Sequence, residues 1–136
     1  ALAVLALHQW KKRERFEAHR RVIAQIYQQN LITPIVTHPT LSSQADPALL
    51  RYPIQTKLRD SIFKAAKQAR IELGDWYAAP IAPPGINEKA AGFDRFITLN
   101  ATHLSQETVN LPTHIHVTEE DAKRIVDVIY SAIRPS

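Results

Sequence analysis

The sequence predicts a small α+β domain, in which a short, mostly antiparallel sheet has helices packed on one face and follows a long linking helix. Helical periodicity dominates both ends of the chain, and the apolar segments between them have the length of strands. At 136 residues the chain can form one hydrophobic core but not two. We therefore expect a linking helix over residues 1–31 and one domain over residues 32–136.

The first helix is predicted over residues 1–30, which no glycine or proline interrupts. Its apolar residues recur near helical spacing: Leu2, Leu5, Phe16, Ile23, Ile26 and Tyr27. The basic stretch at residues 11–15 has few core residues, so we expect the middle of the helix to lie in solvent. A helix of this length in so small a chain indicates that part of its packing partner is missing.

The middle of the chain alternates loops, strands and a helix. Three prolines make residues 33–47 a loop. A strand is predicted over residues 49–55, at a sheet edge because Pro53 cannot donate to a ladder. A helix over residues 57–70 follows, and alternation predicts a short strand at residues 71–73. The inward face of this helix is predicted to hold Leu58, Ile62, Ala65, Ala66 and Ala69.

The last third contains the best-defined element. Prolines exclude regular structure from residues 75–85, and residues 108–111 predict the last strand. Thr118 with Asp121 three residues later forms a capping-box variant, which predicts the start of the final helix. Another helix is predicted over residues 93–104, with one apolar face made of Phe93, Phe96, Ile97 and Leu104. The apolar face of the final helix is Ala122, Ile125, Val126, Ile129, Ala132 and Ile133.

Composition excludes several classes of protein. Hydrophobic residues make up 45% of the chain and charged residues 22%, and no apolar run approaches the roughly 18 residues of a membrane span. The absence of cysteine excludes disulfides and thiolate metal sites and fits the cytoplasm, where we expect the protein. Methionine is absent even at position 1, so we expect the chain to be cut from a longer protein.

The net charge of +4 does not predict nucleic-acid binding. The basic clusters lie on predicted helices with acidic residues between them, and no exposed aromatic residues alternate with them. We interpret these clusters as solvated helix faces.

Motifs for phosphate binding and nucleophilic catalysis are absent. Only Gly74, Gly85 and Gly92 occur, too far apart for a dinucleotide fingerprint or a P-loop. No nucleophile elbow is present. His114 and His116 have a workable spacing for a metal, but no third ligand is evident nearby, so we interpret both as loop residues.

Residues Asp75, Trp76 and Tyr77 are the candidate binding residues. An aromatic pair beside a carboxylate in a proline-stiffened loop could form the wall of a ligand site. Equally, Trp76 could plug the end of the sheet while Tyr77 caps the loop. The residues alone leave both readings open.

A succession of motifs resembles the C-terminal part of DegT/DnrJ/StrS-type aminotransferases. The motifs are Arg-Tyr-Pro-Ile at 51–54, Leu-Gly-Asp-Trp-Tyr at 73–77, Asn-Leu-Pro-Thr-His at 110–114 and Val-Thr-Glu-Glu at 117–120. The resemblance implies a pyridoxal-phosphate enzyme with the aspartate-aminotransferase fold of type I, which aminates a keto sugar, commonly nucleotide-linked. It implies a homodimer when complete, in surface polysaccharide or lipopolysaccharide biosynthesis.

The resemblance also implies that the large domain, with the Schiff-base lysine and the cofactor site, is absent from this chain. No catalytic or cofactor-binding residue is therefore expected here, and no cofactor bound to this chain alone. Asp75, Trp76 and Tyr77 would contact the sugar. Many members carry a histidine near the end of this loop, where residues 79–83 have none. The alternative is a free-standing binding or scaffolding module derived from this domain.

Overall fold

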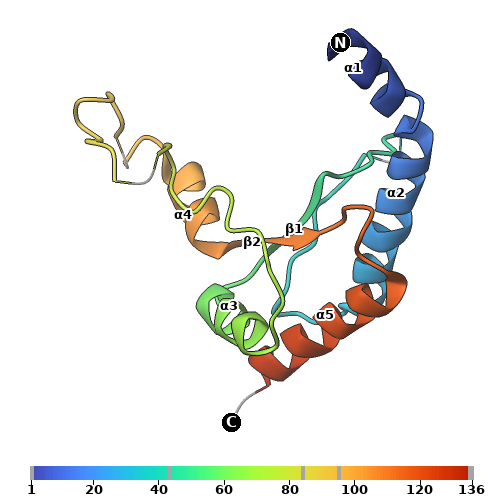
Figure 1. The fold of residues 1–136 in the computed structure, drawn as a ribbon. Helices are drawn as coiled ribbons and strands as arrows, with labels where there is room; N and C mark the ends of the chain where they lie inside the picture. The colour runs from blue at the N-terminus through green and yellow to red at the C-terminus, as the bar shows by residue number, and fades with distance from the viewer. Residues whose placement is uncertain (1, 43, 84, 95, 135–136) are drawn as a thin grey trace.

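The centre of the molecule is a two-stranded antiparallel sheet of β1 (Arg51–Gln55) and β2 (Thr108–Pro112) (Figure 1). The structure, a computed structural model, describes residues 2–42, 44–83, 85–94 and 96–134. The described residues form the helices α1 (Leu2–Trp10), α2 (Arg13–Asn30), α3 (Arg59–Gln68), α4 (Leu99–Glu107) and α5 (Glu119–Ile133). Buried residues of α2, α3 and α5 form one hydrophobic cluster with those of the sheet, which confirms the predicted α+β class.

The register of the sheet places its apolar side chains on one face. Tyr52 pairs with Leu111 and Ile54 with Val109, and all four are buried in the core. The proline at position 53 lies opposite Asn110, whose N–H points away from β1 to the carbonyl of Gly74 at 3.1 Å. Because antiparallel pairs alternate, Pro53 occupies a position where the ladder needs no donor. Its predicted place in an edge strand is confirmed.

Strand β1 begins two residues later than predicted. The hydroxyl of Thr113 lies 2.8 Å from the carbonyl oxygen of Leu49 and 2.9 Å from that of Leu50. The Thr113 hydroxyl therefore donates to these two carbonyls in place of backbone N–H groups of a neighbouring strand. Buried Thr113 fixes the entry to β1 against the exit from β2.

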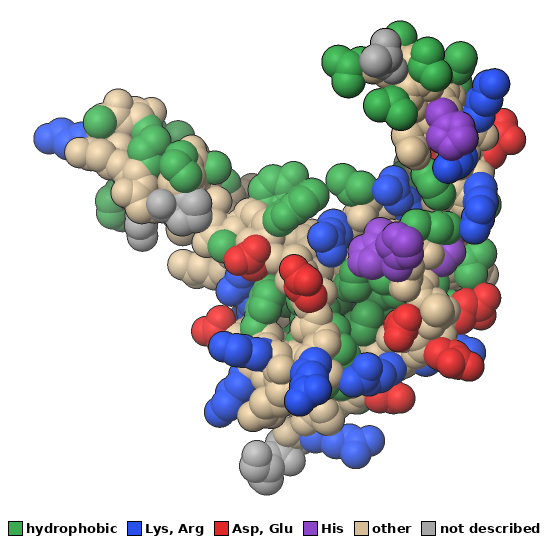
Figure 2. All heavy atoms as spheres, in the orientation of Figure 1, with side chains coloured by type: hydrophobic (Ala, Val, Ile, Leu, Met, Phe, Trp, Pro, Cys, Tyr) green, Lys and Arg blue, Asp and Glu red, His purple; other side chains and the backbone are tan. Residues whose placement is uncertain are grey.

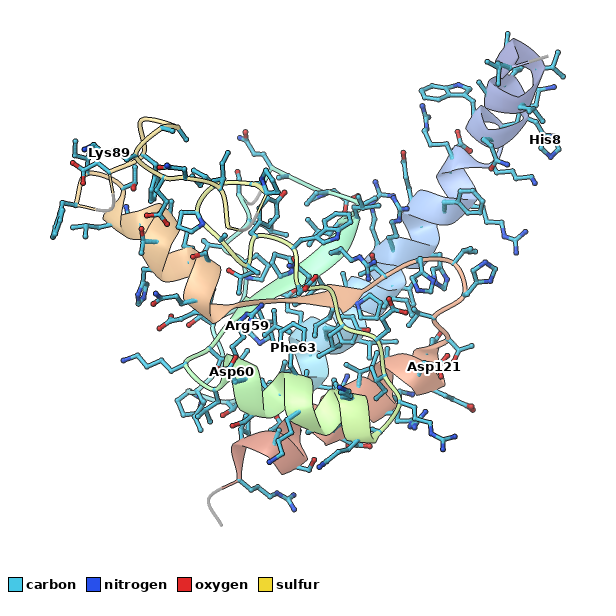
Figure 3. All side chains as sticks on the ribbon, turned by 60° about the vertical axis from the view of Figure 1, so that its left-hand side comes forward. His8, Arg59, Asp60, Phe63, Lys89 and Asp121 are labelled. Carbon is cyan, nitrogen blue, oxygen red and sulfur yellow. The ribbon has the colours of Figure 1, made fainter. Side chains whose placement is uncertain are left out.

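Helix α3 buries Ile62 and Ala66, as the sequence predicts. Figure 3 shows Arg59 at its start, where the guanidinium lies 4.6 Å from the ring centroid of Phe63 and 3.6 Å from the Asp60 carboxylate. Its Nε donates to the carbonyl oxygen of Thr108 at 3.1 Å, which ties α3 to the start of β2.

The strand predicted at residues 71–73 is wrong. Helix α3 ends in a Schellman motif: the N–H of Ile71 donates to the carbonyl of Ala66 at 2.8 Å, and Arg70 adopts a left-handed φ of 57°. This turn redirects the chain, and only Gly74 forms a β-bridge, with Asn110. The local alternation of residues 71–73 thus belongs to a helix end, which sequence periodicity did not separate from a strand.

The helix predicted over residues 93–104 begins later, at Leu99. The Asp94 carboxylate accepts from the N–H of Phe96 at 2.8 Å, and its carbonyl accepts from the N–H groups of Ile97 and Thr98. These hydrogen bonds close a separate turn at Asp94 ahead of the helix. Phe96 and Ile97 are 88% and 82% exposed, so the predicted apolar face of this helix is also wrong.

The single helix predicted over residues 1–30 is divided into α1 and α2 by a turn at Lys11 and Lys12. The N–H of Lys12 donates to the carbonyl of Gln9 at 3.0 Å, a tight turn that ends α1. Helix α1 buries no residue and extends from the body with apolar side chains on its surface (Figures 1 and 2). Because α1 packs against no other element, nothing holds it in line with α2, and the helix is interrupted at the basic segment. No helix of the described residues has the length and apolar character to cross a membrane.

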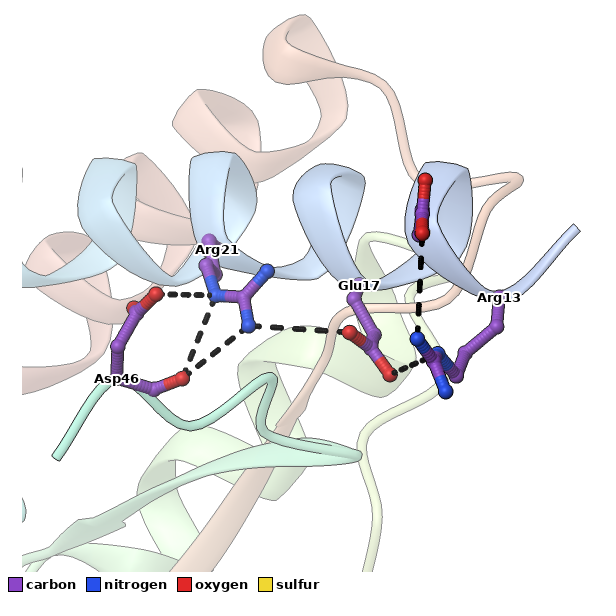
Figure 4. A network of polar contacts seen from close by, with 5 residues as sticks. Arg13, Glu17, Arg21 and Asp46 are labelled. Carbon is purple, nitrogen blue, oxygen red and sulfur yellow. Dashed lines mark hydrogen bonds and ion pairs between the residues drawn. The ribbon is translucent and has the colours of Figure 1, made fainter.

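Helix α2 is tied to the following loop by ion pairs (Figure 4). Glu17 lies 3.3 Å from Arg13 and 3.9 Å from Arg21, and Arg21 lies 2.9 Å from the carboxylate of Asp46. These ion pairs are partly exposed, so each contributes little to the stability of the fold. The stronger anchor is Tyr27, which is buried and donates to the Pro112 carbonyl at 2.9 Å.

Helix α5 is the element that the sequence predicts best. The Thr118 hydroxyl accepts from the N–H of Asp121 at 3.0 Å, and the Asp121 carboxylate accepts from the N–H of Thr118 at 3.0 Å. The predicted capping box is confirmed. The predicted apolar face is confirmed too, with Ala122, Ile125, Val126, Ile129 and Ile133 buried and Ala132 partly buried against the core.

Thr118→Ala should lower the free energy of unfolding by about 1 kcal/mol, because the N–H of Asp121 loses its acceptor. Urea unfolding measures the change. Thr118→Ser keeps the hydroxyl and should stay near the parent value, so equal losses in both variants would contradict the cap.

Candidate functional site

The loop that follows Gly74 is positioned by β2. The N–H of Gly74 donates to the carbonyl of Asn110 at 2.8 Å. The side-chain amide of Asn110, a residue only 4% exposed, donates to the carbonyl of Trp76 at 3.1 Å. A Cβ at position 74 would lie 3.0 Å from the Asn110 Cβ, a tight contact, so the close approach favours glycine.

Residues 75–82 line a cavity of about 600 Å³, within the size range of small-molecule sites. The predicted residues Asp75, Trp76 and Tyr77 all lie on its wall, and the rest of the wall is apolar. Trp76 is 47% exposed and Tyr77 is 73% exposed, so Trp76 is not a buried plug at the end of the sheet.

The backbone of Tyr77 is strained. Its φ is 65°, in the left-handed region that a bulky residue rarely adopts. Strain of this kind costs on the order of 1–3 kcal/mol and tends to lie at functional positions. It is a second observation, besides the cavity, that distinguishes this loop from an ordinary connection.

Arg51 lies against the ring of Trp76. Its guanidinium carbon is 5.4 Å from the Trp76 ring centroid, within the range of a cation–π contact. Because Arg51 pairs in register with Pro112, the start of β1 lies beside the segment that carries His114 and His116. The site therefore continues from the aromatic loop into a basic corner.

The surroundings of His114 disfavour its protonated form. Partial burial is the main reason that its pKa is lowered, and the positive charges of Arg51, His116, His19 and Arg20 lower the pKa further. His19 on α2 holds the segment by a 3.1 Å hydrogen bond between its Nε2 and the carbonyl of His114. Four basic groups from α2, β1 and the loop after β2 thus act on one imidazole.

The two histidines do not complete a metal site. The rings of His114 and His116 lie 6.0 Å apart, centroid to centroid. Within the described parts of the chain, no group of three metal-ligating side chains (His, Cys, Asp or Glu) could hold an ion. A catalytic zinc needs at least three protein ligands.

Sequence reasoning missed Arg51 and Asn110 as site residues. Their importance depends on the register between strands more than fifty residues apart, which no local pattern gives. The signal that was present is their place in two motifs, Arg-Tyr-Pro-Ile and Asn-Leu-Pro-Thr-His. The sequence predicts His114 as a loop residue, whereas the structure surrounds it with the basic residues Arg51, His116, His19 and Arg20.

Residues 1–130 match the sequence pattern of the DegT/DnrJ/EryC1/StrS aminotransferase family. The chain belongs to this family. Its fold is similar to that of DesV from S. venezuelae, solved in complex with a ketimine intermediate, with a TM-score of 0.83 at 21% identity over 98% of this chain and 36% of DesV.

Two other family structures have similar folds. A DegT/DnrJ/EryC1/StrS aminotransferase from Brucella abortus gives a TM-score of 0.77 at 21% identity, over 92% of this chain and 33% of the other. The sugar aminotransferase CalS13 from Micromonospora echinospora gives 0.76 at 19% identity, over 92% and 33%. This family member thus spans about a third of the length of these proteins. No curated protein sequence matches it.

The cofactor implied by the family resemblance, pyridoxal phosphate, needs a lysine for its Schiff base. Among the described residues, no lysine lines the cavity at residues 75–82, whereas Lys64 and Lys67 line a separate open hollow beside α3. The cavity at residues 75–82 therefore offers no lysine for a Schiff base. All seven lysines are exposed: Lys11, Lys12, Lys57, Lys64, Lys67, Lys89 and Lys123.

Arg51→Met should raise the pKa of His114, because the substitution removes the largest neighbouring charge that disfavours the imidazolium. Titration of the His114 Cε1–H resonance by NMR measures the shift. Lys64→Met on α3 also removes one positive charge and should leave the His114 pKa unchanged. A His114 pKa that is insensitive to Arg51→Met would contradict the described corner.

Proposed function

We propose that the chain is the C-terminal part of a pyridoxal-phosphate-dependent aminotransferase that aminates a keto sugar carried on a nucleotide. The observation that carries the proposal is the family match over residues 1–130, supported by the similarity to part of several sugar aminotransferases. A role in surface polysaccharide or lipopolysaccharide biosynthesis and a cytoplasmic location stay predictions.

In this proposal residues 1–31 link the small domain, residues 32–136, to a large domain that precedes it and supplies the Schiff-base lysine. Helix α1 supports such a partner, because a contiguous exposed apolar surface marks a protein contact. The exposed apolar residues of α1 are Leu2, Val4, Leu5, Leu7 and Trp10. The complete enzyme is proposed to be a homodimer.

The loop at residues 75–82 is proposed to form one wall of the substrate cleft. The ring of Trp76 is steadied by Arg51 on one side and its carbonyl by Asn110. An aromatic face packs against the apolar face of a sugar ring, and the Asp75 carboxylate can accept hydrogen bonds from sugar hydroxyls. Tyr77 adds a second ring and a hydroxyl. The apolar wall that follows favours a sugar position with few polar groups.

In the complete natural protein, Trp76→Ala should raise KM for the keto-sugar nucleotide on the order of tenfold, the equivalent of about 1.4 kcal/mol. The cofactor absorbance should not change, because Trp76 contacts the sugar and the lysine lies in the large domain. Phe96→Ala removes another exposed ring outside the cavity and should leave KM as it is. Steady-state kinetics and the absorbance spectrum are the measurements.

Two results would contradict the proposed enzyme. One is a natural protein whose N-terminal side contains no domain with a lysine that is reduced onto the cofactor by borohydride. The other is a Trp76→Ala variant with the parent's KM. The first result would favour the alternative, a non-catalytic binding or scaffolding module.

A further inference from the structure

Arg51 is a half-buried arginine whose donors are not used by the protein. Among the described residues, its side chain contacts the Trp76 ring, and no carboxylate or hydrogen-bond acceptor of this part of the chain pairs with it. Arg59, which is similarly half-buried, has both a carboxylate and a carbonyl partner (Figure 3). A guanidinium presents five N–H donors in a fixed plane, and those of Arg51 remain accessible to solvent and to a ligand.

Trp76 and Gly74 hold the guanidinium in place. A Cβ at position 74 would lie 3.8 Å from the Arg51 Cζ, an ordinary van der Waals contact, so the guanidinium lies close beside the backbone at Gly74. The indole on the other side stabilises a planar cation against its face. Arg51 is therefore fixed at the edge of the cavity wall rather than free in solvent.

The groups nearest to this corner are mostly basic. His114 and His116 follow the strand that pairs with β1, and His19 and Arg20 reach the corner from α2. Figure 2 shows histidine and basic side chains gathered between α2 and the loop after β2. The acids on the hollow beside the histidines are Glu72 and Asp121. Asp121 is already engaged by the cap of α5.

An anion beside converging basic groups is favoured, because it is attracted to the arginines and stabilises protonated imidazoles. The planar fork of arginine binds carboxylate and phosphate by two parallel hydrogen bonds, and neutral or protonated imidazoles add donors. A group held between Arg51 and the histidines would lie at the edge of the aromatic loop.

We propose that Arg51, together with His114 and His116, binds an oxyanion of the substrate: a phosphate of the sugar's nucleotide carrier or the carboxylate of the amino donor. The assignment of the anion to a substrate rests on the proposed function. The existence of the anion site does not depend on the proposed function. In this site Arg51 is a binding and orienting residue, which fixes how far the sugar or the amino donor extends past Trp76.

The test is a titration of this chain, at constant ionic strength, with inorganic pyrophosphate in one arm and L-glutamate in the other. NMR follows the amides of Arg51 and Trp76 and the Cε1–H of His114. We expect saturable shifts at these groups and a rise in the His114 pKa on binding, because an anion favours the imidazolium. Arg51→Met should weaken binding about tenfold or more.

Two further variants separate the role of the fork from charge and folding. Lys64→Met removes the same charge from α3 and should change the affinity by less than about twofold. Arg51→Lys keeps the charge without the fork, and its affinity should lie between those of the parent and Arg51→Met. Arg51→Lys also serves as the readout if Arg51→Met does not keep the parent's amide spectrum.

Saturation by pyrophosphate alone supports the site and assigns it to the phosphate, whereas saturation by glutamate alone supports it and assigns it to the carboxylate. Absence of saturable shifts, or equal weakening by Arg51→Met and Lys64→Met, overturns the site. Loss of cofactor binding in the complete protein would contradict the proposed enzyme but leave these titrations unaffected, so the two failures are distinguishable.

Discussion

The antiparallel pairing of β1 with β2 is the constraint on which the rest of the structure depends. It joins segments that lie more than fifty residues apart and aligns Tyr52 with Leu111 and Ile54 with Val109. These four side chains give α2, α3 and α5 a common apolar surface to cover. Since a two-stranded sheet is marginal by itself, this burial supplies the stabilisation, and the sheet in turn fixes where the helices meet.

The same pairing builds the candidate site on the sheet's outer edge. Asn110 turns its backbone toward Gly74 and its amide toward Trp76, while Arg51 opposite Pro112 stands beside the histidine segment. One register thus places an aromatic loop, a guanidinium and two imidazoles in one corner. A shift of one residue would turn the core residues outward and separate these groups. Fold and site are therefore specified together by one strand pairing.

The parts of the fold that the sequence predicts are those specified by local chemistry. The cap formed by Thr118 and Asp121 and the helical period after it determine α5, and the inward face of α3 follows from spacing alone. The wrong predictions have local competitors that periodicity does not weigh: the left-handed Arg70 after α3 and the side-chain turn at Asp94. At the site, Asp75, Trp76 and Tyr77 could be chosen by residue type, whereas Arg51 and Asn110 depend on register.

Strand β2, through the bridge between Asn110 and Gly74, holds the loop of residues 75–82 beside Arg51. Amide hydrogen exchange tests it most directly, because only a formed bridge protects the Gly74 N–H. We expect the Gly74 amide to exchange as slowly as that of Asn110 and far more slowly than the amides of residues 75–82. If Gly74 exchanges as fast as that loop, the loop is not anchored to the sheet and the account is contradicted.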